Sequence, residues 1–198
     1  MNKDQKLLEE AYQSIYESAV EPLYFGPPER KQEFLDWLKK LKHEVHSDGS
    51  VSVEGDVLLK ELGLDRMPFN FRSATGHFDC YYNNLTSLKG APKEIGGDFY
   101  CYCNYLTSLK GAPKKVGGGF YCHYNYLTSL KGAPNEVEGD FSCHNNKLTS
   151  LEGAPEIIKG DFTSDQFSDA DYRAFAKKRK YVDNKLDKDL NVDLEDFS

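Results

Sequence analysis

Residues 85–105 read LTSLKGAPKEIGGDFYCYCNY, and the next 21 residues repeat this string with few changes. Internal repetition at a fixed period indicates a repeat protein, in which each unit packs mainly on its neighbours. The clearest column of equivalent residues opens the LTSL motif and consists of Leu85, Leu106, Leu127 and Leu148. The 21-residue period predicts about five coils between residues 51 and 167.

Each unit contains Phe and Cys in alternation, with an Asn three residues after the Cys, as in Phe99, Cys101 and Asn104. Alternation places Phe and Cys on one face of a short strand, and both are common interior residues. The Asn side chain is expected to hydrogen-bond backbone groups of the following turn. The spacing F-x-C-x-x-N-x-L-x-x-L matches the core pattern of leucine-rich repeats. We therefore expect a solenoid of short parallel strands ~4.8 Å apart.

Four units carry a Gly-Ala-Pro motif in the return segment, and two of these units have a glycine pair before the Phe, at Gly96–Gly97 and Gly117–Gly118. Proline has no backbone donor, so this segment is predicted to be extended or turn-like rather than helical. The glycine pairs are typical of tight turns with positive φ.

Helices are expected at both ends, because a terminal coil exposes its packing face. Pro28 is predicted to begin a helix that runs through FLDWLKKL, and Ser168 with Asp171 resembles a capping box for a C-terminal helix. A further N-terminal helix is predicted from the helical spacing of Leu8, Tyr12, Ile15 and Ala19. The expected organisation is a helical cap over residues 1–48, a leucine-rich-repeat-like solenoid over 49–167, and a C-terminal helix with an acidic tail over 168–198.

The composition argues against several classes of function. A net charge of −7 argues against a general nucleic-acid or membrane-surface binder, because phosphates repel an acidic protein. The sequence has no apolar run that would span a bilayer and no signal-peptide stretch at its charged N-terminus, so a cytoplasmic location is expected. In such a reducing compartment the five cysteines would be thiols.

The outward strand positions are where function is expected, since packing does not dictate them. In the middle coils they hold tyrosine and histidine, although small polar residues would suffice for solubility. Aromatic residues are enriched at binding hot spots, where tyrosine gives a large contact area at low entropic loss. The alternative is aromatic stacking that only stiffens the sheet. The predicted binding residues are Asp79, Tyr81, Tyr82, Tyr100, Tyr102, Tyr105, Tyr121, His123, Tyr124, Tyr126 and His144.

Other candidate sites are weaker. The column of Cys80, Cys101, Cys122 and Cys143 is expected to face the core rather than to bind metal. Cys103 lies outside that column, but no base accompanies it as a nucleophile. His123 and His144 share one outward position in adjacent coils and lack a clear third metal ligand. With no catalytic constellation or cofactor motif, we expect neither an enzyme nor a bound metal or cofactor.

The array resembles the leucine-rich-repeat-like proteins of tailed bacteriophages and prophages, whose units read roughly LTSLEGAPKEVGGDFxCxxN. The likeness covers the whole array, with G-A-P, G-G-D-F and C-x-x-N in register, and implies the fold and a phage origin. More distantly, the units are similar to those of secreted bacterial leucine-rich-repeat effectors, some of which carry a separate ubiquitin-ligase domain with a catalytic cysteine. This chain has no cysteine after Cys143, so that activity is not implied.

These observations lead to hypotheses of different classes. The first is a non-enzymatic module that binds a host protein, for defence evasion or host takeover, through its Tyr/His-rich strand face. The second is a protein that sequesters a small ligand, a nucleotide or sugar, by stacking. Single-stranded nucleic acid would also stack on tyrosine, but the acidic balance weighs against it. A structural protein with no dedicated site, or a homo-oligomer, remains compatible with the sequence.

Overall fold

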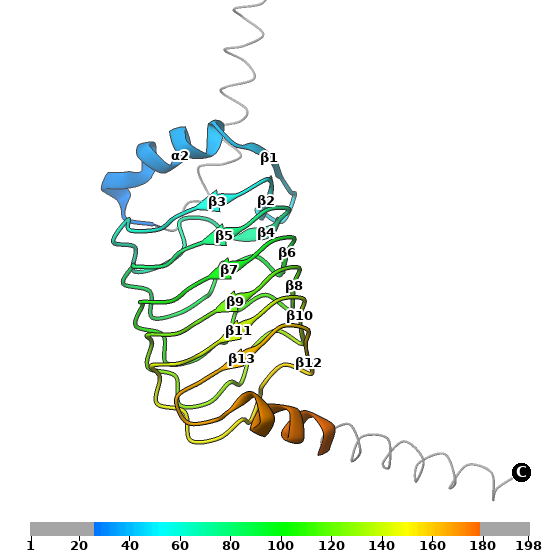
Figure 1. Ribbon diagram of the computed structural model, residues 1–198. Coiled ribbons are helices and arrows are strands. Elements are labelled where there is room, and N and C mark those ends of the chain that lie inside the picture. The colour runs from blue at the N-terminus through cyan, green and yellow to red at the C-terminus, as the bar shows by residue number, and fades with distance from the viewer. Residues whose placement is uncertain (1–25, 179–198) are drawn as a thin grey trace, which may run out of the picture.

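A computed structural model describes residues 26–178, which form a β-solenoid of about five turns (Figure 1). Each turn contributes one short strand to each of two sheets, and all pairings between successive turns are parallel. Adjacent coils pair in register at the 21-residue period, for example Phe99 with Phe120. The predicted first helix and the acidic tail lie outside the described residues.

The first sheet has seven strands and runs along one side of the solenoid (Figure 1). Its first pair is antiparallel and the others are parallel. In spatial order the strands are β1 (Lys42–Val45), β2 (Val51–Glu54), β4 (Phe71–Ala74), β6 (Glu94–Ile95), β8 (Lys115–Val116), β10 (Glu136–Val137) and β12 (Ile157–Ile158).

The second sheet has six strands and contains the predicted Phe-x-Cys positions. In the Phe-containing units, only the Phe and the residue after it form the paired strand, and the Cys follows just after the strand ends. In spatial order the strands are β13 (Phe162–Thr163), β11 (Phe141–Ser142), β9 (Phe120–Tyr121), β7 (Phe99–Tyr100), β5 (Phe78–Asp79) and β3 (Val57–Leu58).

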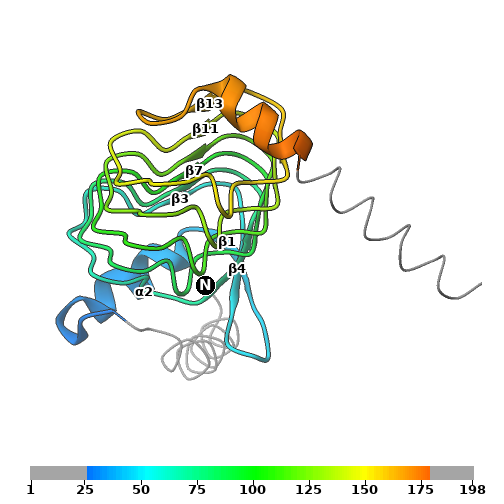
Figure 2. The same ribbon diagram turned by 90° about the horizontal axis from the view of Figure 1, so that it is seen from below.

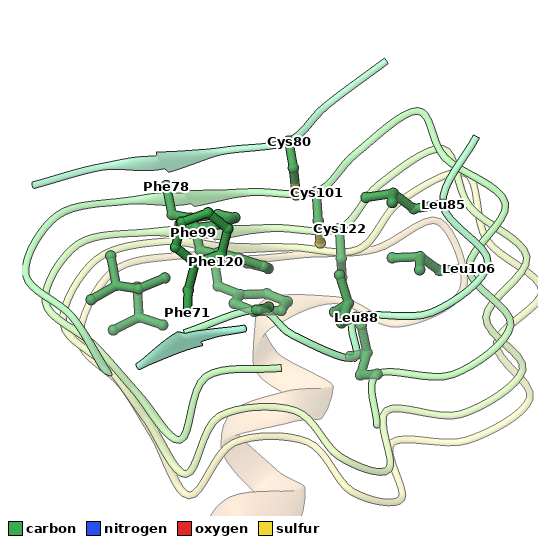
Figure 3. Packing of buried hydrophobic residues seen from close by; sticks show 14 of the residues in the cluster. Phe71, Phe78, Cys80, Leu85, Leu88, Phe99, Cys101, Leu106, Phe120 and Cys122 are labelled. Atoms are coloured by element: carbon green, nitrogen blue, oxygen red, sulfur yellow. The ribbon is translucent and has the colours of Figure 1, made fainter. Parts of the chain in front are cut away.

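The core is built from the repeated columns and fills the space between the two sheets. Phe99 and Phe120 are fully buried and stack with ring centroids 5.2 Å apart, and Figure 3 shows these rings beside the Cys101 and Leu106 columns. Burial of a Phe side chain contributes about 1.5–3 kcal/mol, so each coil adds a similar increment to one continuous core. The predicted inward positions of Phe, Cys and Leu are confirmed.

Asparagine fixes the corner that follows each second-sheet strand. The side chain of Asn104 is buried, and its Oδ1 accepts a hydrogen bond from the Leu85 N–H at 3.0 Å. Its Nδ2 donates to the carbonyls of Cys80 on the preceding coil and Cys101 on its own coil, at 3.0 and 3.2 Å. The predicted contact with turn backbone is thus confirmed, and it also joins successive coils.

The glycines divide into two kinds. Gly111 of a Gly-Ala-Pro motif has a φ of 95°, where a side chain would be strained. Gly97 of a glycine pair has no such φ, and the expectation of positive φ there was wrong. The pair instead permits close stacking, because a Cβ on Gly97 would lie 2.9 Å from the carbonyl carbon of Gly76 in the preceding coil.

At the N-terminal end, a 3-10 turn, η2 (Pro28–Arg30), leads into the helix α2 (Lys31–Lys39) beside the first coil (Figure 1). Its buried side chains Phe34, Leu35 and Leu38 join the solenoid core. The chain then enters the antiparallel β1–β2 hairpin, whose turn holds the HSDGS stretch and projects from the outline of the coils (Figure 2). The expected boundary between residues 48 and 49 therefore falls inside a hairpin turn.

At the other end, residues 169–178 are helical and lie under the last coil (Figure 1). The predicted capping box is present, since Asp171 N–H donates to Ser168 Oγ at 3.1 Å and Ser168 N–H donates to Asp171 Oδ2 at 2.8 Å. Tyr172 stacks on Phe162 with centroids 5.0 Å apart, and Arg173 donates to the carbonyl of Gly160 at 2.8 Å. No helix among residues 26–178 is long and apolar enough to cross a membrane.

Candidate functional site

The outward side of the six-stranded sheet carries the predicted tyrosines and histidines. We call this surface the aromatic face. Its members come from the strands β7 and β9 and from the corner residues beyond each second-sheet strand. Every one of them is at least partly exposed. They are Tyr81, Tyr82, Tyr100, Tyr102, Tyr105, Tyr121, His123, Tyr124, Tyr126 and His144.

A stacked ladder runs through the middle of the aromatic face. The ring of Tyr102 stacks on Tyr81 with centroids 4.6 Å apart and on His123 with centroids 4.4 Å apart. His123 stacks on His144 at 4.4 Å, and all three pairs lie within 10° of parallel. In-register parallel coils cause this arrangement, because they place equivalent side chains ~4.8 Å apart.

Two shorter stacks flank the ladder. Tyr100 stacks on Tyr121 with centroids 5.0 Å apart, and Tyr105 stacks on Tyr126 at 6.0 Å. The Tyr100 hydroxyl donates to Asp98 Oδ2 at 2.7 Å, and burial with this bond raises the Tyr100 pKa well above its usual value. Tyr100 therefore stays a neutral hydroxyl at physiological pH.

One column of the aromatic face has an unusual backbone. Tyr82, Cys103 and Tyr124 have φ of 49°, 52° and 51°, in the left-handed region that residues with a Cβ rarely occupy. Glu61 and Asn145 occupy the same column with φ of 58° and 51°. This conformation costs about 1–2 kcal/mol for such residues. Backbone strain of this kind often accompanies functional positions.

The strained corners push tyrosine rings into solvent. Tyr82 is 59% exposed and Tyr124 is 54% exposed. Tyr82 makes edge-to-face contacts with Tyr81 and Tyr102 at 5.7 and 6.3 Å, so it rests beside the ladder between two coils. Tyr124 has the same relation to the two histidines, at 5.7 and 5.6 Å. Each ring thus keeps more than half of its surface exposed to solvent.

Asp79 differs from the other predicted binding residues, because it is only 7% exposed. Burial raises its pKa, while the Tyr81 N–H donates to its Oδ1 at 3.4 Å and Lys60 Nζ lies 3.9 Å from its Oδ2. It acts on the face as a nearby negative charge rather than as an exposed contact.

The two histidines of the ladder have different polar surroundings. Burial, and then the neighbouring His144, lower the pKa of His123 to about 4, so His123 is neutral at physiological pH. Its Nδ1 is buried and has no hydrogen-bond partner among the described residues. His144 Nδ1 lies 2.9 Å from Ser142 Oγ. No three metal-ligating side chains gather within residues 26–178.

The cysteines separate into two environments. Cys80, Cys101, Cys122 and Cys143 are buried, and burial raises their thiol pKa, for Cys143 to about 12. Cys103 is partly exposed at its strained corner, and a hydrogen bond with it raises the pKa of Tyr82. A phenol whose pKa is raised stays protonated at physiological pH and cannot accept the thiol proton, so Tyr82 does not activate Cys103 as a nucleophile.

A polar cluster at the β1–β2 hairpin was missed by sequence reasoning. His46 Nε2 lies 2.8 Å from Ser52 Oγ, which accepts a hydrogen bond from Ser73 Oγ at 2.9 Å, and Glu44 lies 3.7 Å from His46 Nδ1. Ser52 and Ser73 meet only because β2 and β4 pair in the fold. These contacts join the hairpin turn to the first coils, on a different sheet from the aromatic face.

No protein-family model, curated protein sequence or solved structure matches the chain.

Proposed function

We propose that this protein is a non-enzymatic interaction module that binds a partner protein through the aromatic face. The observation that carries the proposal is the exposure of Tyr82 and Tyr124 at strained corners that core packing does not require to be aromatic. Asn145 stands in the same column, so a residue better suited to this backbone is available there. Tyrosine at these positions is best explained by contact with another molecule.

The extent of the stacked ladder supports a protein partner. Its rings are already ordered by their neighbours, so binding would order few additional side chains, and this lowers the entropic cost of association. The face is also a broad surface spread over four coils rather than an enclosed pocket, which suits a protein surface better than a small molecule.

The finer identity rests on the sequence resemblance. We propose a leucine-rich-repeat-like protein encoded by a phage or prophage, which acts in the host cytoplasm on a host factor. The terminal helices would act as caps, because α2 and residues 169–178 place apolar side chains against the first and last coils.

A capture experiment tests the binding face. The matched variant is Tyr82→Asn with Tyr124→Asn, because Asn145 shows that asparagine fits this backbone. Tagged wild-type and variant proteins, with equal thermal stability, are incubated with bacterial lysate and bound proteins are quantified. We expect the captured partner to fall at least about tenfold, typical of losing two interface anchors. Equal capture by the two proteins would contradict the proposal.

A small-ligand function has one observation in its favour, on the other sheet. An open hollow of about 370 Å³ is lined by Ser50, Arg72, Ser73 and Lys93, among others. Small-molecule sites commonly occupy ~300–1,000 Å³. A nucleotide that raised the melting temperature of wild type but not of Arg72→Ala would favour this function, because a ligand of the native state stabilises it.

A further inference from the structure

The two sides of the solenoid differ in their charged side chains. Carboxylates border the aromatic face. Asp98 accepts a hydrogen bond from the Tyr100 hydroxyl, and burial together with the charges of Asp98 and Asp140 raises the pKa of Tyr121. The acidic residues on this side are Glu61, Asp79, Asp98, Asp140, Asp161 and Asp165. The Gly-Ala-Pro turns and the seven-stranded sheet instead carry exposed lysines, namely Lys89, Lys93, Lys110, Lys114, Lys115 and Lys131. That side also carries glutamates, and Lys115 and Lys131 pair with Glu136 and Glu152, so it bears charges of both signs. The aromatic face, in contrast, is bordered mainly by carboxylates.

Cations of the chain itself already occupy both ends of the aromatic face. Lys60 Nζ lies 5.5 Å from the centroid of the Tyr81 ring, at the start of the ladder. Lys147 Nζ lies 4.8 Å from the centroid of Tyr126, at the opposite end. Within residues 26–178, the cation–π contacts of this face are confined to these two ends. The exposed rings of Tyr82 and Tyr124 lie between them.

We propose that the aromatic face recognises an arginine-rich segment of its partner protein. The inference rests on the proposed function and specifies the chemistry of the partner. A guanidinium group stacks on an aromatic ring more readily than an ammonium group, and it pairs with a carboxylate through two parallel hydrogen bonds. Tyr82 with Glu61, one position earlier in the same column, provides both elements, and Asp165 lies beyond the His144 end of the ladder.

The charge of an arginine-rich segment distinguishes it from other ligands that could stack on the aromatic face. The phosphates of a nucleic acid would meet the carboxylates around the ladder and be repelled. A sugar would stack on tyrosine without any dependence on salt, because it carries no charge. An arginine-rich segment gains from both the rings and the carboxylates, and its binding must weaken as salt screens them.

The test uses the full chain and fluorescent peptides of twelve residues, each with six arginines, six lysines or six glutamates. Fluorescence anisotropy at low and high salt measures the affinity. Two double variants are compared with wild type: Tyr82→Asn/Tyr124→Asn, and Glu61→Gln/Asp165→Asn. Gln166 follows Asn145 in the corner column, so glutamine is a residue that this column already contains. The control is Glu94→Gln/Glu152→Gln, which removes the same charge from the lysine-bearing side.

We expect the arginine peptide to bind tightest of the three peptides. Its affinity should fall about tenfold from low to high salt. The tyrosine variant should weaken it at least about tenfold, and the carboxylate variant about threefold, with the control within about twofold of wild type. Arginine peptide that binds no better than glutamate peptide would overturn the inference. So would equal effects of control and face variants, or tighter binding of a single-stranded oligonucleotide.

The outcomes of the capture experiment distinguish failure of arginine recognition from failure of the proposed binding face. A captured partner that has no basic segment and is lost in the tyrosine variant refutes arginine recognition while leaving the binding face intact. A partner that is captured equally by wild type and the tyrosine variant refutes the binding face, and arginine recognition falls with it.

Discussion

The side-chain oxygen of Asn104 accepts a hydrogen bond from the backbone N–H of Leu85, 3.0 Å away and 19 residues earlier in the chain. The two residues belong to adjacent coils, so each buried asparagine joins one turn of the solenoid to the next. The Asn104 side-chain amide also donates to the backbone carbonyls of Cys80 and Cys101, which are both buried residues.

Replacing this amide should strongly destabilise the solenoid. Asn104→Ala leaves several buried backbone groups without partners, each at a cost of about 1–3 kcal/mol. We expect the free energy of unfolding in urea to fall by about 3 kcal/mol. Asn84→Ala is the control, because Asn84 is exposed, and it should cost less than about 1 kcal/mol. Equal losses in both variants would show that the asparagine column does not stabilise the coils.

His123 predicts a dependence of stability on pH. Its pKa falls from an ordinary value of 6.5 to about 4 on folding, so the unfolded chain binds the proton more readily. Stability should therefore be complete above about pH 7, decline as pH falls through 6.5 toward 4, and level off below that. Because the ring is partly exposed, we expect the loss to be only about 1 kcal/mol after screening.

Urea unfolding of His123→Tyr measures this contribution. Tyrosine occupies the same ladder position in the preceding coil and does not titrate in this range. The difference in stability between wild type and His123→Tyr should change between pH 7 and pH 4.5, although carboxylates titrate in both proteins. A difference that stays constant with pH would rule out the assigned cause.

Thiol chemistry should distinguish one cysteine from the other four. Cys103 is partly exposed, whereas the four buried thiols are inaccessible and have raised pKa values. A disulfide reagent at neutral pH should titrate one thiol rapidly in the native protein and five in denaturant. Cys103→Ser should abolish the rapid reaction. Two or more fast thiols in native wild type would mean that the core column is more open than described.

The C-terminal helix should protect the last coil. Tyr172 stacks on Phe162, and Arg173 donates to the carbonyls of Ile158, the last residue of β12, and Gly160. Removing the helix therefore uncovers apolar surface and strand edges. We expect a chain that ends at residue 167 to lose stability by several kcal/mol or to self-associate, as measured by urea unfolding and light scattering. Arg173→Ala, which keeps the stacked tyrosine, should lose about 1 kcal/mol and stay as monomeric as wild type. A shortened chain as stable and monodisperse as wild type would exclude a capping role.

Part of this fold could be predicted because side-chain chemistry repeats with the coil. Phe99, Cys101 and Asn104 each have one physical role in every unit, so spacing alone revealed the inward face and the corner. The seven-stranded sheet was not predicted, because a two-residue strand such as β8 is too short to show alternation. Its pairing depends on the stacked neighbours rather than on local sequence.

The aromatic face was predicted in composition but not in conformation. The corner column holds Tyr82, Cys103 and Asn145, which share no side-chain chemistry, and it contains no glycine that would signal a left-handed backbone. The burial of Asp79 was not predicted either, because Asp79 occupies the outward strand position that Tyr100 and Tyr121 hold in the next two coils. Such effects arise between coils, where a single repeat carries no information about its neighbours' side chains.

The in-register coils affect the position at which a molecule bound to the aromatic face would dock. A perfectly periodic surface would look the same after a shift of one coil, about 4.8 Å, so a ligand could dock in several equivalent frames. Here the shift replaces Tyr102 with His123, and Tyr105 with Asn84 in the other direction. These differences break the translational symmetry of the backbone. A bound molecule would therefore meet different side chains in each shifted register, and one register can be preferred over the others.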